Sequence, residues 1–94
     1  MRLVFRAEAT ADLRRIASET RRAWGEAQAK AYASGLRDAI KSLRDYPLRY
    51  PEFEPRPGLR RMNSGRHAVL YSVGDESIEI IRVLLVASDL GRFI

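Results

Sequence analysis

The side chains that could do chemistry gather in the second half of the chain. They are basic or aromatic: Arg60, Arg61, Arg66, His67, Tyr71 and Arg82. Metal-free cleavage of RNA could use Arg61, Arg66, His67 and Tyr71, because arginine stabilises the charge on a phosphorane while histidine or tyrosine moves a proton. The alternative, which we favour from sequence, is that the arginines form a solvated face and that Tyr71 is an ordinary strand aromatic.

Other catalytic chemistries lack the residues they need. The chain has one histidine, His67, and no cysteine, so neither a thiolate metal site nor a nucleophile triad can be assembled. It has no G-x-S-x-G elbow, and its glycines form no phosphate-binding loop. We therefore expect no metal and no cofactor, and a conventional enzyme is hard to build from these residues.

Arg82 requires a separate explanation because it sits in an apolar run, residues 80–84. An arginine is rarely buried there without a carboxylate partner. The candidates are Glu79, Asp89 or an acid on the first helix, and we name Arg82 and Asp89 as the candidate structural ion pair.

Length and charge describe a small basic protein. The 94 residues predict a single domain, residues 1–94, and the 46% apolar content allows one modest core. Of the 17 basic residues only Lys30 and Lys41 are not arginine. Arginine suits carboxylates and phosphates, although a net charge of +5 is also ordinary for solubility. The first residues match neither a signal peptide nor a membrane span, so we expect a cytoplasmic protein with no membrane association.

The first half of the chain has the pattern of a strand followed by two helices. Residues 2–6 alternate and are rich in strand formers. The helical period then starts at residue 7 or 10 and runs to Trp24, where Gly25 predicts the end. Apolar residues at three- and four-residue steps predict the buried face of this helix: Leu13, Ile16, Ala17, Thr20 and Trp24.

A second amphipathic helix follows at once, from residue 26 to residue 43. Its predicted buried face consists of Ala29, Tyr32, Ala33, Leu36, Ile40 and Leu43. Two helices joined by one or two residues form an antiparallel hairpin. Gly35 should cost this helix about 1 kcal/mol relative to alanine, so we expect that it allows close approach of the first helix.

The remaining chain predicts a proline-rich connection, residues 47–57, and three strands. The strands cover residues 59–63, residues 66 or 67 to 73, and residues 78–86, with turn residues between them. Except at Glu79 and Arg82 the last strand is apolar on both faces, which predicts that it lies centrally or is covered on both sides. The fold class is therefore α+β, with order β-α-α-β-β-β and a helical hairpin packed on a small, mainly antiparallel twisted sheet.

Several short motifs, in order, resemble one known family. They are F-R-A-E-A-T-A-D-L-R-R-I, W-G-E-A-Q-A-K-A-Y, L-R-D-A-I-K-S-L, R-P-G-L-R-R, G-R-H-A-V-L-Y and I-E-I-I-R-V-L-L-x-x-x-D-L. Together they resemble the RelE/ParE superfamily of toxins from end to end. The W-G-x-x-Q-A pattern and the G-R-H opening of the middle strand are most similar to its ParE-like branch.

This resemblance implies a toxin of a type II toxin–antitoxin system that poisons DNA gyrase, with roles in plasmid stabilisation or stress response. RelE-like members instead cleave ribosome-bound mRNA, with basic side chains at positions that correspond here to Ala68 and Ala87. Alanine cannot do that chemistry, which disfavours ribonuclease action. The last strand also departs from the common ParE-like ending V-L-H-x-R-x-D, because Leu85 and Ala87 replace its polar residues.

Three functions follow: a gyrase poison, a RelE-like mRNA interferase, or a non-toxic remnant that only binds its antitoxin. In each case we expect a hetero-oligomer with a ParD-like antitoxin, of ribbon-helix-helix type, and contact with DNA only through the antitoxin or gyrase. The C-terminal segment of the antitoxin would fold over an apolar groove beside the helical hairpin. The candidate antitoxin-binding residues are Leu13, Ile16, Arg60, Arg61, Tyr71 and Arg82.

Overall fold

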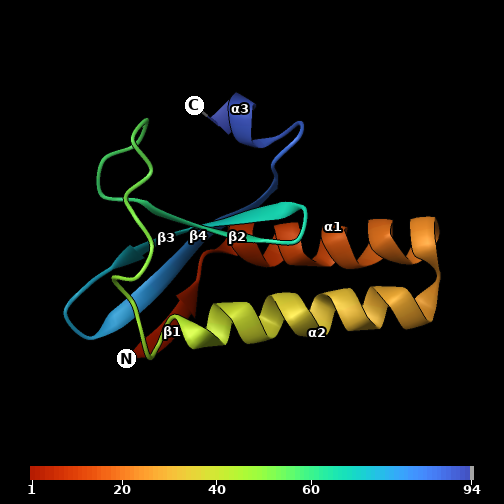
Figure 1. Cartoon of the computed structure of the whole chain (residues 1–94), viewed down its shortest axis with the longest axis horizontal. Coiled ribbons are helices and arrows are strands. Elements are labelled where there is room, and N and C mark those ends of the chain that lie inside the picture. Colours follow the sequence, from red (N-terminus) through yellow and green to blue (C-terminus); the bar gives the residue numbers. More distant parts are fainter. Residues whose placement is uncertain (94) are drawn as a thin grey trace.

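A computed structural model describes residues 1–93 of the chain. The helical hairpin lies along one side of a small sheet, and the loop after the hairpin crosses to the other side (Figure 1). The elements are β1 (Arg2–Phe5), α1 (Ala7–Trp24), α2 (Glu26–Ser42), β2 (Arg60–Ser64), β3 (His67–Val73), β4 (Ser77–Leu85) and α3 (Leu90–Phe93). The predicted β-α-α-β-β-β order is confirmed, and α3 is an addition that the sequence did not suggest.

The sheet has the strand order β1-β4-β3-β2. β1 runs parallel to β4, whereas β4 with β3 and β3 with β2 are antiparallel. β4 therefore lies in the interior of the sheet, which confirms the prediction made from its apolar faces. The first strand, whose place was left open by the sequence, is an edge strand, because the helical hairpin carries the chain over the sheet before it returns.

A glycine turn joins the two helices. Gly25 has a φ of 87° and its N–H donates to the Arg21 carbonyl at 2.9 Å, so α1 ends at Trp24, as predicted, and α2 starts at Glu26. The main core lies between the hairpin and the sheet. Its fully buried members include Ile16, Leu36, Ile40, Met62, Val69, Tyr71, Ile78, Ile80 and Val83.

The prediction that Gly35 permits a close helix approach is wrong. Gly35 is exposed, and a Cβ atom placed on it would meet no atom within 4 Å. The neighbouring Leu36 faces the core instead. The helices pack through other residues, and Gly35 lies on the solvent side of α2.

The opposite sheet face is covered by the loop and by α3. Phe53, Leu90 and the half-buried Phe93 pack there against sheet residues such as Leu70 and Leu84. Of the loop aromatics, Phe53 is 6% exposed and holds the loop on the sheet, whereas Tyr46 is 63% exposed and does not. Among residues 1–93, no helix combines the length and apolar character needed to cross a membrane.

Candidate functional site

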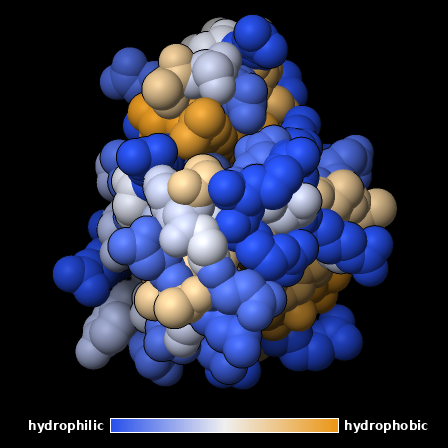
Figure 2. Space-filling model, turned by 90° about the vertical axis from the view of Figure 1, so that its right-hand side faces the viewer, coloured by the Kyte–Doolittle hydropathy of each residue, from blue (hydrophilic) through white to orange (hydrophobic). Residues whose placement is uncertain are grey.

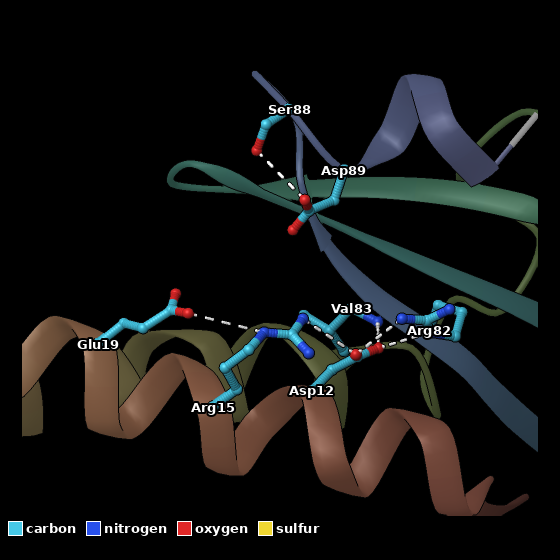
Figure 3. Close-up of polar contacts among 7 residues, drawn as sticks. All are labelled: Asp12, Arg15, Glu19, Arg82, Val83, Ser88 and Asp89. Atoms are coloured by element: carbon cyan, nitrogen blue, oxygen red, sulfur yellow. Dashed lines mark hydrogen bonds and ion pairs between the residues drawn. The ribbon is translucent and has the colours of Figure 1, made fainter.

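The carboxylate of Asp12 on α1 pairs with Arg82 on β4 (Figure 3). The pair is bidentate, with Arg82 Nε 2.7 Å from Oδ2 and Nη2 2.9 Å from Oδ1. Two more donors reach the same carboxylate: the backbone N–H of Val83, at 2.9 Å, and Arg15 Nη2, at 3.1 Å. Asp12 is 1% exposed, so the whole negative charge is balanced by these contacts.

The partner of Arg82 is thus the acid on the first helix, and the predicted pair of Arg82 with Asp89 is wrong. Asp89 accepts a hydrogen bond from the Ser88 hydroxyl at 3.3 Å. It acts on Arg82 only through space, since its charge helps to raise the Arg82 pKa. The third candidate, Glu79, pairs with Arg6 at 3.3 Å.

The path of the backbone explains why a carboxylate is needed at Asp12. The N–H of Arg6 bonds to the Ile80 carbonyl, and the chain then leaves the sheet to start α1. The edge of β4 beyond that point has no neighbouring strand, and Asp12 Oδ2 accepts the Val83 N–H there. A side chain from α1 therefore takes the place of a strand partner.

A bulge in β4 decides where Arg82 points. Leu70 pairs with Arg82 but Tyr71 pairs with Ile80, so Ile81 is one extra residue in β4. This shifts the alternation, and Ile80 and Val83 belong to the core under the helices. Arg82 is left outside that core, where its guanidinium reaches Asp12.

Opposing influences set the pKa of each member of this pair. Burial raises the pKa of the Asp12 carboxyl, but the hydrogen bonds from Arg82, Val83 and Arg15 and the positive charge of Arg82 together outweigh it, so the pKa lies below its ordinary value of 3.8. The hydrogen bond to Asp12 raises the pKa of Arg82, against the smaller effect of burial. Both groups are therefore charged at neutral pH.

A second polar cluster joins the hairpin to the turn between β2 and β3. The Tyr32 hydroxyl on α2 lies 2.5 Å from Nδ1 of His67 and accepts the Arg66 N–H at 3.0 Å. His67 is 6% exposed. Burial lowers its pKa from 6.5, an effect that nearby Glu19 and Asp89 oppose. His67 is therefore neutral at pH 7 and forms part of the packing.

The structure disperses the proposed ribonuclease set. Tyr71 is 0% exposed and its hydroxyl donates to the Pro47 carbonyl at 3.0 Å, while burial raises its pKa. Arg61 is directed to Asn63, with its Nε 2.9 Å from Oδ1. Arg66 is exposed at the turn, next to the buried His67. No convergence of these four side chains on one accessible point exists within residues 1–93.

The candidate antitoxin-binding residues also separate into different places. Leu13 and Ile16 line an apolar groove of about 400 Å³ between β1, α1 and α2, together with Leu3, Phe5, Ala17, Ala33, Leu36, Arg37, Ile40 and Lys41. Arg61 lines a hollow between the loop and α3. Arg60 donates to the Tyr50 carbonyl at 2.6 Å and Arg82 to Asp12. Tyr71, being fully buried, cannot bind a partner, so that prediction is wrong.

Sequence reasoning named an acid on the first helix as a candidate partner of Arg82 without identifying Asp12, and it gave Tyr32 no polar role. A signal for Asp12 was present: the buried residues of α1 are Ala9, Asp12, Ile16 and Thr20, a helical spacing into which a single acid falls. An acid on the buried stripe of a helix indicates a partner elsewhere. For Tyr32 no such pattern exists, because the sequence does not show which polar groups lie near the hydroxyl of a half-buried tyrosine.

Comparison with known proteins identifies the family. The family model described as the ParE toxin of type II toxin–antitoxin system, parDE, matches residues 3–89. Toxin ParE1 of Caulobacter vibrioides is 42% identical over 77 residues, which is 81% of this chain and 79% of that protein. Toxin ParE1 of Mycobacterium tuberculosis is 35% identical over 71 residues, 73% of this chain and 72% of that protein.

A solved structure agrees in fold. A chain of the chromosomal ParDE toxin–antitoxin system from P. aeruginosa superposes with a TM-score of 0.80 at 21% identity, covering 92% of this chain and 96% of that one. The family model over residues 3–89 and the identity to the two ParE1 toxins lead to one conclusion: the chain belongs to the ParE toxin family of type II toxin–antitoxin systems.

Proposed function

We propose that the chain is a toxin that acts in the cytoplasm by binding DNA gyrase and that a cognate antitoxin neutralises it. The observation that carries the choice of binding over RNA cleavage is the burial of the acid–base candidates. Tyr71 is 0% and His67 is 6% exposed, and both polar groups are engaged inside the protein. A group that moves a proton to or from RNA must lie within hydrogen-bond reach of it.

The two positions that carry basic side chains in RelE-like toxins support the same choice. Ala68 is 0% exposed, so even a basic residue there would lie under the loop and α3. Ala87 is exposed in the turn after β4, and its methyl group can neither stabilise a phosphate nor carry a proton. The polar ending of β4 that is common in ParE-like toxins is absent as well, and the target contacts that we propose for this chain lie elsewhere on its surface.

The apolar groove is the seat that we propose for the antitoxin. Its floor is formed by leucine, isoleucine and alanine side chains, and Arg37 and Lys41 stand at its rim. An amphipathic segment with an apolar stripe and flanking acids fits such a groove, with side chains at helical spacing as anchors. The antitoxin segment would be of this kind and would fold on binding.

A matched pair of substitutions on α2 tests the groove. Ala33 is half-buried and lines it, whereas Ala31 lies two residues away and is exposed. Ala33→Glu should weaken antitoxin binding by about tenfold or more, because a charge is placed in an apolar contact. Ala31→Glu should leave the dissociation constant unchanged. Isothermal titration with the product of the adjacent reading frame gives both values.

The toxic activity is tested with the purified chain. Added to DNA gyrase and relaxed plasmid, it should inhibit supercoiling and increase the cleaved DNA that is trapped on gyrase, and the antitoxin should reverse both effects. Ribosomes translating a defined mRNA form the second arm. Cut mRNA with gyrase unaffected would establish the interferase instead, and antitoxin binding without either effect would establish a non-toxic remnant.

A further inference from the structure

The two motifs that point to the ParE-like branch meet in space. Trp24 and Tyr32 come from the end of the hairpin, and Gly65, Arg66 and His67 form the turn into β3. The rings of Trp24 and Tyr32 meet edge to face at 5.7 Å, and those of Tyr32 and His67 at 5.5 Å. We call these five residues the hairpin corner.

The turn is held in one conformation by Tyr32. Gly65 has a φ of 57°, a backbone conformation that favours glycine. A Cβ atom at Gly65 would lie 2.6 Å from Cε1 of Tyr32, so only glycine fits against the ring. The Tyr32 hydroxyl also contacts three polar groups around the turn: the Ser64 carbonyl at 3.3 Å, the Arg66 N–H at 3.0 Å and His67 Nδ1 at 2.5 Å.

These contacts hold the backbone of Arg66, and its side chain lies over the Trp24 ring. Its carbonyl accepts the Val86 N–H at 3.0 Å, which ties the turn to the end of β4. Its guanidinium carbon lies 4.7 Å from the centroid of the Trp24 ring. An arginine restrained in this way loses little conformational entropy when it binds a partner.

Among the described residues, Arg66 has no acid beside it, in contrast to the arginines that form ion pairs. Arg6, Arg15 and Arg82 each lie within 4.0 Å of a carboxylate. Arg66 is exposed, and in the part of the chain that the structure describes, residues 1–93, its side chain has no ion pair. Its planar edge is therefore free to donate to a ligand, while Trp24 covers one face.

We propose that Arg66, held on Trp24, binds a carboxylate on the toxin's target protein, at a surface separate from the antitoxin groove. This inference rests on the proposed function, because it requires a target other than the antitoxin. Arginine stacked on an aromatic ring and offering a two-pronged edge is typical of interface hot spots.

The local charge favours a single carboxylate over a nucleic-acid backbone. Arg21 and Arg22 in the last turn of α1 add to Arg66, but Glu26 opens α2 directly across the turn. Glu19 also lies close enough to act on His67. Acids interleaved with the arginines repel a polyanion, and the stacked face of Trp24 is not open to a base.

The hairpin corner and the groove lie on different parts of the hairpin. The groove residues on α2 begin at Ala33 and continue to Lys41, and none of the five corner residues lines it. Figure 2 views the molecule from the side on which the helices turn, and that face is mainly hydrophilic, with one apolar patch in its upper part and another at its lower right. Because the groove and the corner share no residue, an antitoxin seated in the groove would leave Arg66 uncovered and would exclude a large target by steric hindrance.

Substitutions of Arg66 test this proposal by growth arrest in cells that lack the antitoxin and by inhibition of purified gyrase. Arg66→Ala should raise the half-inhibitory concentration by about tenfold or more, and Arg66→Lys should fall between it and the unsubstituted chain, because lysine keeps the charge but not the planar edge. Arg44→Ala replaces an exposed arginine in the turn just after α2; it is the matched control and should change nothing. All three variants should bind the antitoxin with unchanged affinity and unfold at the same temperature.

The outcomes separate this inference from the proposed function. If the unsubstituted chain arrests growth and Arg66→Ala does so equally, Arg66 is not a target contact and only this inference is lost. If Arg66→Ala loses binding to a labelled duplex DNA in proportion to its loss of toxicity, the ligand is a phosphate and the carboxylate proposal is wrong. If the unsubstituted chain affects neither growth nor gyrase, both proposals fall.

Discussion

At the scale of single residues, the fold depends on polar groups whose contacts are complete. Within residues 1–93, no buried side-chain nitrogen or oxygen lacks a hydrogen-bond partner. Asp12 is the strongest case because its carboxylate receives donors from α1 and β4 at once. Removing the carboxylate leaves the buried Val83 N–H without its acceptor and the half-buried Arg82 without a counter-charge, which costs more than the pair itself contributes.

Asp12→Asn should therefore lower the free energy of unfolding by about 2–4 kcal/mol. The amide cannot accept from all four donors, and it leaves Arg82 without a counter-charge. Urea denaturation followed by circular dichroism measures the change. Glu19→Gln, which breaks only the exposed contact with Arg15 at 3.8 Å, should cost less than about 1 kcal/mol. Equal losses for the two variants would contradict the role given to Asp12.

Of the four groups with shifted pKa values, His67 and Asp12 titrate below neutral pH and predict separate pH windows for stability. The His67 pKa is lowered by folding from 6.5, so its contribution is complete above that pH and is lost as the pH falls below it. The Asp12 pKa is lowered from 3.8, so its contribution is lost only at pH values below that.

Thermal unfolding between pH 7.5 and pH 5 should accordingly show a fall in melting temperature that belongs to His67. In His67→Asn that fall should be absent, because the amide does not titrate, although the variant is less stable throughout. A fall of the same size in the variant would assign the titration to another group.

At the scale of elements, the turns around the hairpin require two glycines, whereas a third glycine lies inside a helix where nothing requires it. Gly25 and Gly65 have positive φ values, which the turns require. Gly35 sits in the middle of α2 and touches nothing. The structure gives no reason for a glycine there, and helix propensity alone decides the effect of replacing it.

Gly35→Ala should stabilise the protein by about 0.5–1 kcal/mol. Gly65→Ala should destabilise it, because the new methyl group would lie 2.6 Å from the Tyr32 ring and the backbone would be strained. Denaturant midpoints of the two variants give the comparison. A loss of stability in Gly35→Ala would show that this position does support a close contact.

At the scale of the whole molecule, two surfaces flank one hairpin. We propose that the groove holds the antitoxin and that the hairpin corner binds the target. Substitutions that share no contacts have additive effects. In the double variant Ala33→Glu with Arg66→Ala, antitoxin affinity should therefore match Ala33→Glu alone, and toxicity should match Arg66→Ala alone. Non-additive values, measured by the same titration and growth assays, would place both sites on one surface.

The sequence by itself determined the local structure and the family. Hydrophobic periodicity and the glycine and proline positions defined β1, α1, α2 and the three later strands to within a residue or two, because these patterns report which face of each element is buried. The ordered motifs gave the toxin family, which the match over residues 3–89 confirms. The sequence alone also showed that Leu85 and Ala87 replace the polar residues of the common ParE-like ending.

Only the tertiary structure decided which polar groups meet. That Arg82 pairs with Asp12 and not Asp89 depends on the bulge at Ile81 and on where β1 ends. That Trp24 supports Arg66 depends on how the hairpin packs across the turn into β3. Contacts between groups far apart in the chain are fixed by distances and directions, which a one-dimensional pattern of residue types does not contain.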